Sequence, residues 1–291
     1  MITCSNGWDQ ADIPALGTAP DATFWVALEQ PGPWGAKAFT QSRLSPELGA
    51  QLETTIAEAG GRLLLIRDPL SHPDLPGQRR ILVGGGPVSS PWLGTTLLDD
   101  PQALPGLLAS WGDLHEHTTP PAPLEACEPA LLVCTNGRRD RCCAVKGAPL
   151  AHALAERFQG RVWEATHLGG HRFATTTLSL PARQMLAFVD EELAVRALDG
   201  KLLPLPPKHD RGRTDLPQPI RSVDAWLRDR IAETDPAALT YRADDAVVHA
   251  RHRDGRSWAL SASKQTSPQV QLPESCGKAA VPASWWQVSE A

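Results

Sequence analysis

Cysteine and histidine residues form two short motifs whose spacing is typical of metal ligands. Cys134 and Cys143 are separated by eight residues, and His167 and His171 by three that include two glycines. Thiolates and imidazoles are ligands both of zinc and of iron–sulfur clusters. The four residues therefore predict a metal site with two cysteine and two histidine ligands, and either kind of metal would suit them.

The spacing of the ligands bears on the choice between the two metals. Zinc accepts two thiolates and two imidazoles, and the interval from His167 to His171 lies within zinc-finger spacing. The eight residues between Cys134 and Cys143, however, are wide for a zinc finger. A Rieske centre would need one cysteine and one histidine on each loop, but position 136 is Asn136 and no cysteine lies near His167. The motif thus pairs cysteine with cysteine and histidine with histidine.

The other cysteines have less clear roles. Cys142 is either a bystander or a substitute ligand, because spacing alone does not exclude it. The adjacent Cys142 and Cys143 also raise the alternative of a thiol oxidoreductase, which is disfavoured because redox motifs usually read Cys-x-x-Cys and a vicinal disulfide is strained. Cys4 stands alone in the N-terminal part of the chain.

Basic residues flank both motifs and favour thiolate over thiol. They are Arg138, Arg139, Arg141, Lys146 and Arg172. Positive charge beside a redox centre also predicts docking of an acidic redox partner protein, such as a flavoprotein reductase.

Two stretches with the same order of elements are predicted to position these residues. The first has strands at 24–28, 62–66, 80–83 and 92–98, with helices at 45–59 and 101–114. The second has strands at 130–133, 161–165 and 173–179, with helices at 149–158 and 183–198. Each ligand motif follows a predicted strand, and sites in α/β sheets collect at the carboxyl ends of strands.

These elements predict an α/β fold with two tandem units and a small C-terminal antiparallel β segment. The units span 1–118, without ligands, and 124–200, with both motifs; a proline-rich linker separates them. Residues 201–217 are expected to form a loop. The extension at 218–291 is expected to hold a helix at 220–233 and a small sheet that turns at Asp254-Gly255.

Composition excludes several classes of protein. The chain has 291 residues, of which 42% are hydrophobic and 21% charged, as in an ordinary globular protein. A net charge of −5 argues against nucleic-acid binding. No apolar run is long enough for a membrane span, and the N-terminus lacks the pattern of a signal peptide, so a cytoplasmic location is expected.

The two motifs resemble those of the sucrase/ferredoxin-like family, whose members are similar to thioredoxin-like [2Fe-2S] ferredoxins. The segments 134–143 and 166–173 carry the resemblance, which extends over essentially the whole chain through segments such as 29–34 and 273–278. In the bis-histidinyl subgroup, a His-x3-His pair replaces the second cysteine pair of the ferredoxins. Position 136 departs from the family pattern, because Asn136 stands where the family often has histidine.

The resemblance implies a thioredoxin-like ferredoxin fold and a [2Fe-2S] cluster. Cys134 and Cys143 would bind one iron, and His167 and His171 the other. The expected function is electron transfer or redox sensing, with a pH-dependent potential, by an electron carrier rather than an enzyme with its own substrate. The alternative is a structural Cys2His2 zinc site. No paired carboxylates support the glycoside hydrolysis that the family name suggests.

Overall fold

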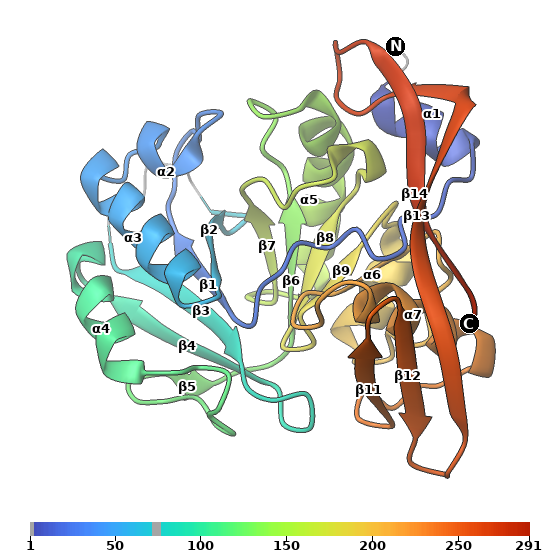
Figure 1. Ribbon diagram of the computed structural model, residues 1–291. Coiled ribbons are helices and arrows are strands. Elements are labelled where there is room, and N and C mark those ends of the chain that lie inside the picture. The colour runs from blue at the N-terminus through green and yellow to red at the C-terminus, as the bar shows by residue number, and fades with distance from the viewer. Residues whose placement is uncertain (1–2, 72–76) are drawn as a thin grey trace.

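A computed structural model describes residues 3–71 and 77–291, which form a mixed α/β protein with two separate sheets (Figure 1). The larger sheet has ten strands of mixed direction. In sheet order they are β10 (Asp210–Arg213), β9 (Gln184–Leu186), β8 (Thr177–Leu180), β6 (Ala130–Cys134), β7 (Val162–Ala165), β2 (Arg62–Arg67), β1 (Trp25–Glu29), β3 (Arg79–Gly85), β4 (Trp92–Leu98) and β5 (Glu125–Ala126).

The two halves of this sheet repeat one arrangement. In the first half, α3 (Pro46–Glu58) connects the parallel strands β1 and β2; in the second, α5 (Ala148–Arg157) connects the parallel strands β6 and β7. Two antiparallel strands then extend each half, β3 and β4 in the first and β8 and β9 in the second. A helix follows in each, α4 (Leu104–Trp111) or α6 (Glu191–Leu198). Antiparallel pairing of β2 with β7 joins the halves into one sheet.

Local sequence explains why these elements form where they do. The hydroxyl of Ser45 accepts a hydrogen bond from the N–H of Leu48 at 3.3 Å and caps α3, and proline occupies the first turn. Leu52 and Ile56 give that helix its buried face. Gly60, at φ +82°, follows the helix in a conformation that glycine adopts without strain.

Strand β6 is buried along its whole length because both faces of the sheet are covered. Leu131 and Val133 pack toward the cluster of apolar side chains that includes Leu154 of α5. On the opposite face, Leu132 and Cys134 belong to a second apolar cluster that joins the two halves of the sheet. The predicted ligand loop therefore leaves β6 from the middle of the hydrophobic core.

The C-terminal extension forms a separate antiparallel sheet of four strands. Helix α7 (Ile220–Ile231) is followed by β11 (Leu239–Asp244), β12 (Val247–His252), β13 (Ser257–Pro273) and β14 (Ala280–Glu290). The predicted helix, antiparallel sheet and turn at Asp254-Gly255 are confirmed. The hairpin of β13 and β14 is far longer than expected and reaches helix α1 (Cys4–Gln10) at the N-terminus (Figure 1), where the indole of Trp8 donates to the carbonyl of Pro273 at 3.0 Å.

Three local predictions were wrong in part. The helix expected at 183–198 begins only at Glu191, after the N-cap Asp190, because residues 184–186 form β9 instead. The loop expected at 201–217 contains β10, which pairs with β9 at the edge of the large sheet. The strand expected at 173–179 begins at Thr177, after the 3-10 turn η3 (His171–Phe173). At residues 184–186, pairing with β8 outweighs the local propensity for a helix.

No helix within the described ranges combines the length and the apolar character that crossing a membrane requires.

Candidate metal centre

The end of β6 positions the two predicted cysteine ligands. Cys134 is the last residue of the strand, is fully buried, and donates its N–H to the carbonyl of Thr176 at 3.0 Å. Cys143 begins η2 (Cys143–Gly147), a single π-helical turn of a kind common at functional sites. A Cβ on Gly147 would lie 2.2 Å from the carbonyl oxygen of Cys134, so glycine alone lets this turn lie against the strand end.

The end of β7 positions the two predicted histidine ligands. Thr166 fixes the chain just before them, because its N–H donates to the carbonyl of Leu65 at 2.9 Å and its hydroxyl accepts from the N–H of Leu65 at 3.1 Å. Gly169 and Gly170 then take positive φ values of +78° and +67°, and the chain turns back on itself. The rings of His167 and His171 consequently lie side by side, with centroids 5.1 Å apart.

Three of the four predicted ligands form a compact group. The potential ligand atoms of Cys134, Cys143 and His167 all lie within 4.8 Å of one another. The sulfur of Cys134 is 4.0 Å from Nδ1 of His167. His171 lies outside this group but beside it, through its contact with the ring of His167.

The second histidine has one nitrogen free to act as a ligand. Nδ1 of His171 is buried and has no hydrogen-bond partner among the described residues. Nε2 of the same ring lies 3.6 Å from Oδ2 of Asp140. A carboxylate behind the far nitrogen of a ligating imidazole is the usual support for a metal-bound histidine. The donor set, with two thiols and the Nδ1 atoms of two imidazoles, therefore fits a metal or an iron–sulfur cluster.

A hydrogen bond couples the two buried thiols. A hydrogen bond from Cys143, opposed by burial and supported by His167, lowers the pKa of Cys134 well below its usual value. The same hydrogen bond, with burial, raises the pKa of Cys143. Cys134 is therefore the more readily ionised of the two thiols, and a metal cation would displace the thiol protons.

Asp140 connects the cysteine loop to the histidine turn. Burial would raise its pKa, but the hydroxyl of Ser275 and the N–H groups of Cys276 and Cys142 outweigh burial and lower the pKa to about 2. Burial lowers the pKa of His171 in spite of the opposing charge of Asp140. At neutral pH an anionic carboxylate therefore faces a neutral imidazole, the form that binds metal.

Arg211 supports the histidine turn and was missed in the sequence, where it falls in a segment expected to be a loop. It lies in β10 and is 2% exposed. Its guanidinium donates to the carbonyl of Gly169 at 2.9 Å and to the carbonyl of Thr18 at 2.8 Å. Burial and the nearby Arg172 lower its pKa to about 9. No local motif marks this residue, because its partners are 42 and 193 positions away.

Asn136 supports the cysteine loop from the other side. Its side-chain amide is buried and donates to the carbonyl of Gly35 at 3.1 Å. The first half of the chain, which carries none of the four predicted ligands, thus holds the loop that carries two of them.

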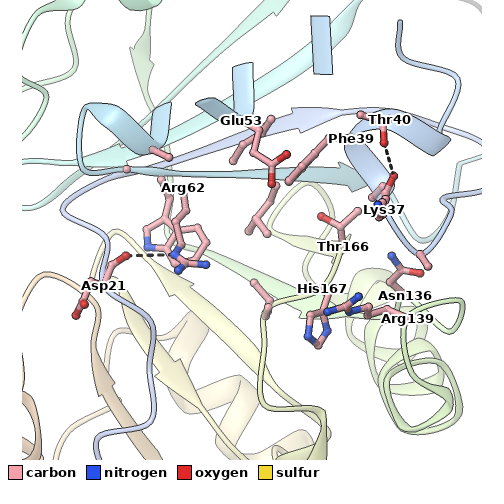
Figure 2. A pocket seen from close by; sticks show the side chains of 18 of the residues that line it. Asp21, Lys37, Phe39, Thr40, Glu53, Arg62, Asn136, Arg139, Thr166 and His167 are labelled. Carbon is pink, nitrogen blue, oxygen red and sulfur yellow. Dashed lines mark hydrogen bonds between the residues drawn. The ribbon is translucent and has the colours of Figure 1, made fainter. Parts of the chain in front are cut away.

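A cavity of about 980 Å³ opens between the two halves of the sheet and reaches His167 (Figure 2). Its rim combines charged residues of both signs, among them Lys37, Glu53, Arg62 and Arg139. His167 and His171 are partly exposed, whereas Cys134 and Cys143 are buried. The centre is therefore accessible to solvent from its histidine side.

Cys142 belongs to a different group from its neighbour Cys143. Its sulfur lies with those of Cys4 and Cys276, beside Asp140. The expectation that Cys4 stands alone was therefore wrong, since the residues that meet it are 138 and 272 positions away. All six cysteines of the chain are free thiols.

The fold and these groups define a mixed α/β protein with buried cysteine-rich sites that could hold metal. The sequence profile of the sucrase/ferredoxin-like family matches residues 15–203, which is more than half of the chain. The chain therefore belongs to the sucrase/ferredoxin-like family. No curated protein and no solved structure matches it.

Proposed function

We propose that the protein holds a [2Fe-2S] cluster through Cys134, Cys143, His167 and His171 and serves electron transfer or redox sensing. The observation that carries this proposal is the pairing of two buried thiols with two adjacent imidazoles, one of which has a buried Nδ1 without a hydrogen-bond partner in the described part of the chain. Membership in the family supports the choice of an iron–sulfur cluster. The cysteines would bind one iron and the histidines the other, as in a bis-histidinyl site.

The topology supports a thioredoxin-like ferredoxin unit at 124–200. Its strands lie in the order β9-β8-β6-β7. The two strands that come first in the chain, β6 and β7, are parallel, whereas β8 is antiparallel to β6 and β9 is antiparallel to β8. The N-terminal half has the same order, β4-β3-β1-β2. We propose that this half is a second thioredoxin-like unit without ligands, which supports the cysteine loop through Gly35.

The ligand set predicts the redox behaviour. When bound, the cluster would supply a one-electron acceptor. Two thiolates bring less negative charge than four, so the potential would exceed that of an all-cysteine ferredoxin. Partly exposed imidazoles can exchange protons with solvent, which would couple the potential to pH. The protein would then act as an electron carrier rather than as an enzyme with its own substrate.

A redox partner would dock over the cysteine loop, where Arg139 lines the cavity that also reaches His167. Arg138, Arg139 and Arg141 are exposed on the cysteine loop, and the side chain of Val145 beside them is 57% exposed. Such a basic surface with an apolar residue suits an acidic protein, and a flavoprotein reductase is the partner class that we propose. A reducing compartment such as the cytoplasm, where thiols stay free, is the proposed location.

A structural zinc ion is the second candidate. The compactness of the group formed by Cys134, Cys143 and His167 favours it, because one tetrahedral ion takes ligands that are close to one another. In that case His171 would complete the Cys2His2 set.

Metal analysis separates the two candidates. Full-length protein produced with ample iron under anaerobic conditions should be brown and contain iron and acid-labile sulfide in equal amounts. Cys143→Ser should lose the iron, whereas Cys142→Ser, whose sulfur faces a different group, should keep it. Colourless protein that carries only zinc would refute the cluster, and loss of iron in Cys142→Ser alone would refute the ligand assignment.

A further inference from the structure

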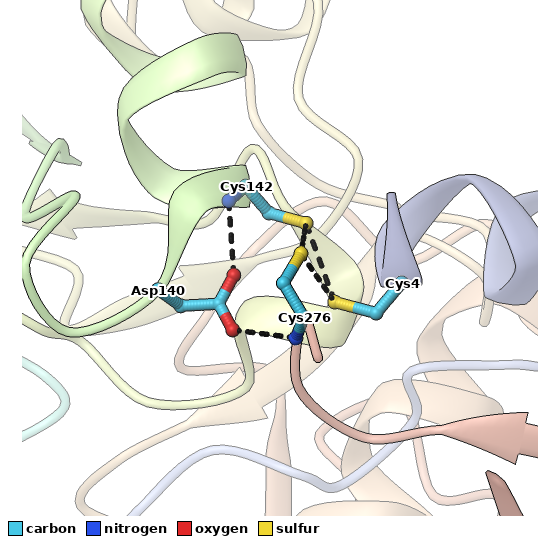
Figure 3. Close-up of side chains that lie close together, drawn as sticks. All are labelled: Cys4, Asp140, Cys142 and Cys276. Carbon is cyan, nitrogen blue, oxygen red and sulfur yellow. Dashed lines mark hydrogen bonds between the residues drawn. The ribbon is translucent and has the colours of Figure 1, made fainter. Parts of the chain in front are cut away.

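Three cysteines from distant parts of the chain meet next to the candidate cluster site (Figure 3). The sulfur of Cys142 lies 3.3 Å from that of Cys4 and 3.1 Å from that of Cys276. The third pair, Cys276 and Cys4, has sulfurs 3.6 Å apart. The three sulfurs therefore form a small triangle, and each side of it is close to the sulfur spacing within a metal site.

Each of the three cysteines lies in a different part of the fold. Cys4 begins helix α1, Cys142 precedes η2 in the cysteine loop, and Cys276 lies in the turn between β13 and β14. Cys4 and Cys142 are 3% and 0% exposed, and Cys276 is partly buried. Ala174 packs against the group. Three thiols in an apolar setting, from segments that share no sequence motif, are not explained by ordinary core packing alone.

Asp140 holds two of the three ligand backbones in place. Its Oδ1 accepts a hydrogen bond from the N–H of Cys142 at 2.9 Å, and its Oδ2 accepts from the N–H of Cys276 at 2.9 Å and from the hydroxyl of Ser275 at 2.7 Å. Both carboxylate oxygens are thereby engaged, so we assign Asp140 to positioning the ligands. Supporting groups of this kind are as characteristic of metal sites as the ligands themselves.

We propose that Cys4, Cys142 and Cys276 form a second metal site that binds a thiophilic ion, Zn²⁺, through three thiolates, with solvent in the fourth position. Tetrahedral zinc with Zn–S bonds of about 2.3 Å spaces its sulfurs by roughly 3.8 Å. The sulfurs would need to move apart by about 0.2 Å for the widest pair and about 0.7 Å for the closest. A disulfide would instead draw one pair together to about 2.05 Å and leave the third sulfur out. Zinc uses all three, and its binding displaces the thiol protons.

This site goes beyond the proposed redox function and does not depend on it. The family match at 15–203 includes neither Cys4 nor Cys276. A zinc ion here would fasten the N-terminal helix and the C-terminal hairpin to the loop that carries Cys143. Asp140, which also faces His171 at 3.6 Å, would connect the two metal sites.

The zinc content of full-length protein and of four single variants tests the proposal. Wild-type protein should hold one equivalent of zinc in addition to any metal at the first site. Cys4→Ser and Cys276→Ser should each lose that zinc and keep the metal of the first site. Cys127→Ser is the matched control and should keep both, because Cys127 belongs to neither group. His167→Ala should lose metal at the first site only.

A second measurement on unmodified protein covers the case in which a variant fails to fold. Zinc X-ray absorption of iron-loaded protein should give three sulfur neighbours at about 2.3 Å. Chelation should expose Cys4 and Cys276 to alkylation, as mapped by peptide mass. A disulfide between any two of the three cysteines, or a zinc content in Cys276→Ser equal to that of the wild type, would overturn the proposal. If the first site holds zinc rather than a cluster, wild type would hold two zinc ions and Cys276→Ser one. Failure of the proposed cluster is thereby distinguished from failure of the second metal site.

Discussion

At the scale of single residues, burial divides the candidate centre into two sides. Cys134 and Cys143 lie in the core, where thiolates are shielded from solvent, while His167 and His171 are partly exposed beside a cavity. A redox centre with this arrangement exchanges electrons and protons through its imidazoles. The proposed exchange of electrons and protons therefore depends on the histidines more than on the cysteines.

Replacing both histidines tests this division. The double variant His167→Cys, His171→Cys should lower the midpoint potential, because two added thiolates make the centre more negative. It should also flatten the pH response of the potential, because the ionisable imidazoles are gone. Potentiometric titration from about pH 6 to 9, where perturbed imidazoles titrate, measures both effects. A wild-type midpoint that is flat over this range would remove the histidines as proton-coupled ligands.

Asp140 should tune the potential through its charge. Its pKa of about 2 keeps it anionic at neutral pH, and it lies 3.6 Å from His171. Asp140→Asn removes that negative charge and should raise the midpoint by on the order of 1 kcal/mol, or roughly 40 mV for one electron. Asp199→Asn, on an exposed residue that ends α6, is the control. An unchanged or lower midpoint in Asp140→Asn would contradict the assigned role.

The residue types and their spacing could predict that the candidate ligands lie near one another, but not what surrounds them. Cys134 and His167 come together because Cys134 ends β6 and His167 follows β7, the adjacent parallel strand, and strand ends of this kind can be recognised in a sequence. Arg211 and the group around Cys4 could not be recognised in this way. Their contacts join positions more than 40 residues apart, and no local pattern records such contacts.

At the scale of elements, the close approach of η2 to β6 sets the geometry of the cysteine pair. Gly147 permits this approach, because any side chain there would meet the carbonyl of Cys134. The strand expected at 130–133 and the helix expected at 149–158 were confirmed, but the π-helical turn between them was not foreseen. Its conformation follows from packing rather than from propensity.

Gly147→Ala should therefore disturb the site as well as the fold. The new Cβ would force η2 away from the strand, which should destabilise the protein by about 1–3 kcal/mol and weaken metal retention. Gly106→Ala is the control, because nothing lies within 4 Å of a Cβ at that position in α4. Urea unfolding and metal content measure the two effects. Equal stability and metal content in both variants would contradict the close-packing argument.

At the scale of the whole molecule, long-range contacts bind the halves and the extension together. Arg183 donates to the carbonyl of Gly85 at 2.5 Å and to Asp215 at 2.8 Å, so it links β3 with the segment that follows β10. The side chains of Arg183 and Asp215 are each 1% exposed. The tandem order of elements could be predicted because it repeats along the chain, whereas these cross-connections, like β9 and β10, depend on the assembled sheet.

Breaking this ion pair should be costly. Asp215→Ala leaves two buried arginines without their carboxylate and should lower the free energy of unfolding by about 3–5 kcal/mol at pH 7. Asp199→Ala, on an exposed residue, should change it by less than about 0.5 kcal/mol. Chemical unfolding at pH 7 measures both. A loss below about 1 kcal/mol in Asp215→Ala would show that the buried ion pair contributes little to the stability of the fold.

The same pair predicts a dependence of stability on pH. Burial would raise the pKa of Asp215, but Arg213 and Arg183 outweigh burial and lower it. A carboxyl group whose pKa is lower in the folded state stabilises the fold above its unfolded pKa of about 3.9 and loses this contribution as pH falls through the folded pKa. Wild-type protein should therefore lose more stability below about pH 4 than Asp215→Asn does. Parallel acid profiles for the two proteins would contradict the assignment.

Pulsed electron paramagnetic resonance of the reduced protein, with ¹⁵N-labelled histidine, tests the central claim most directly. A [2Fe-2S] cluster held by Cys134, Cys143, His167 and His171 should give a paramagnetic signal with two strongly coupled histidine nitrogens, one of which disappears in His171→Ala. A signal without coupled histidine nitrogen, or a protein that stays silent and holds only zinc, would contradict it.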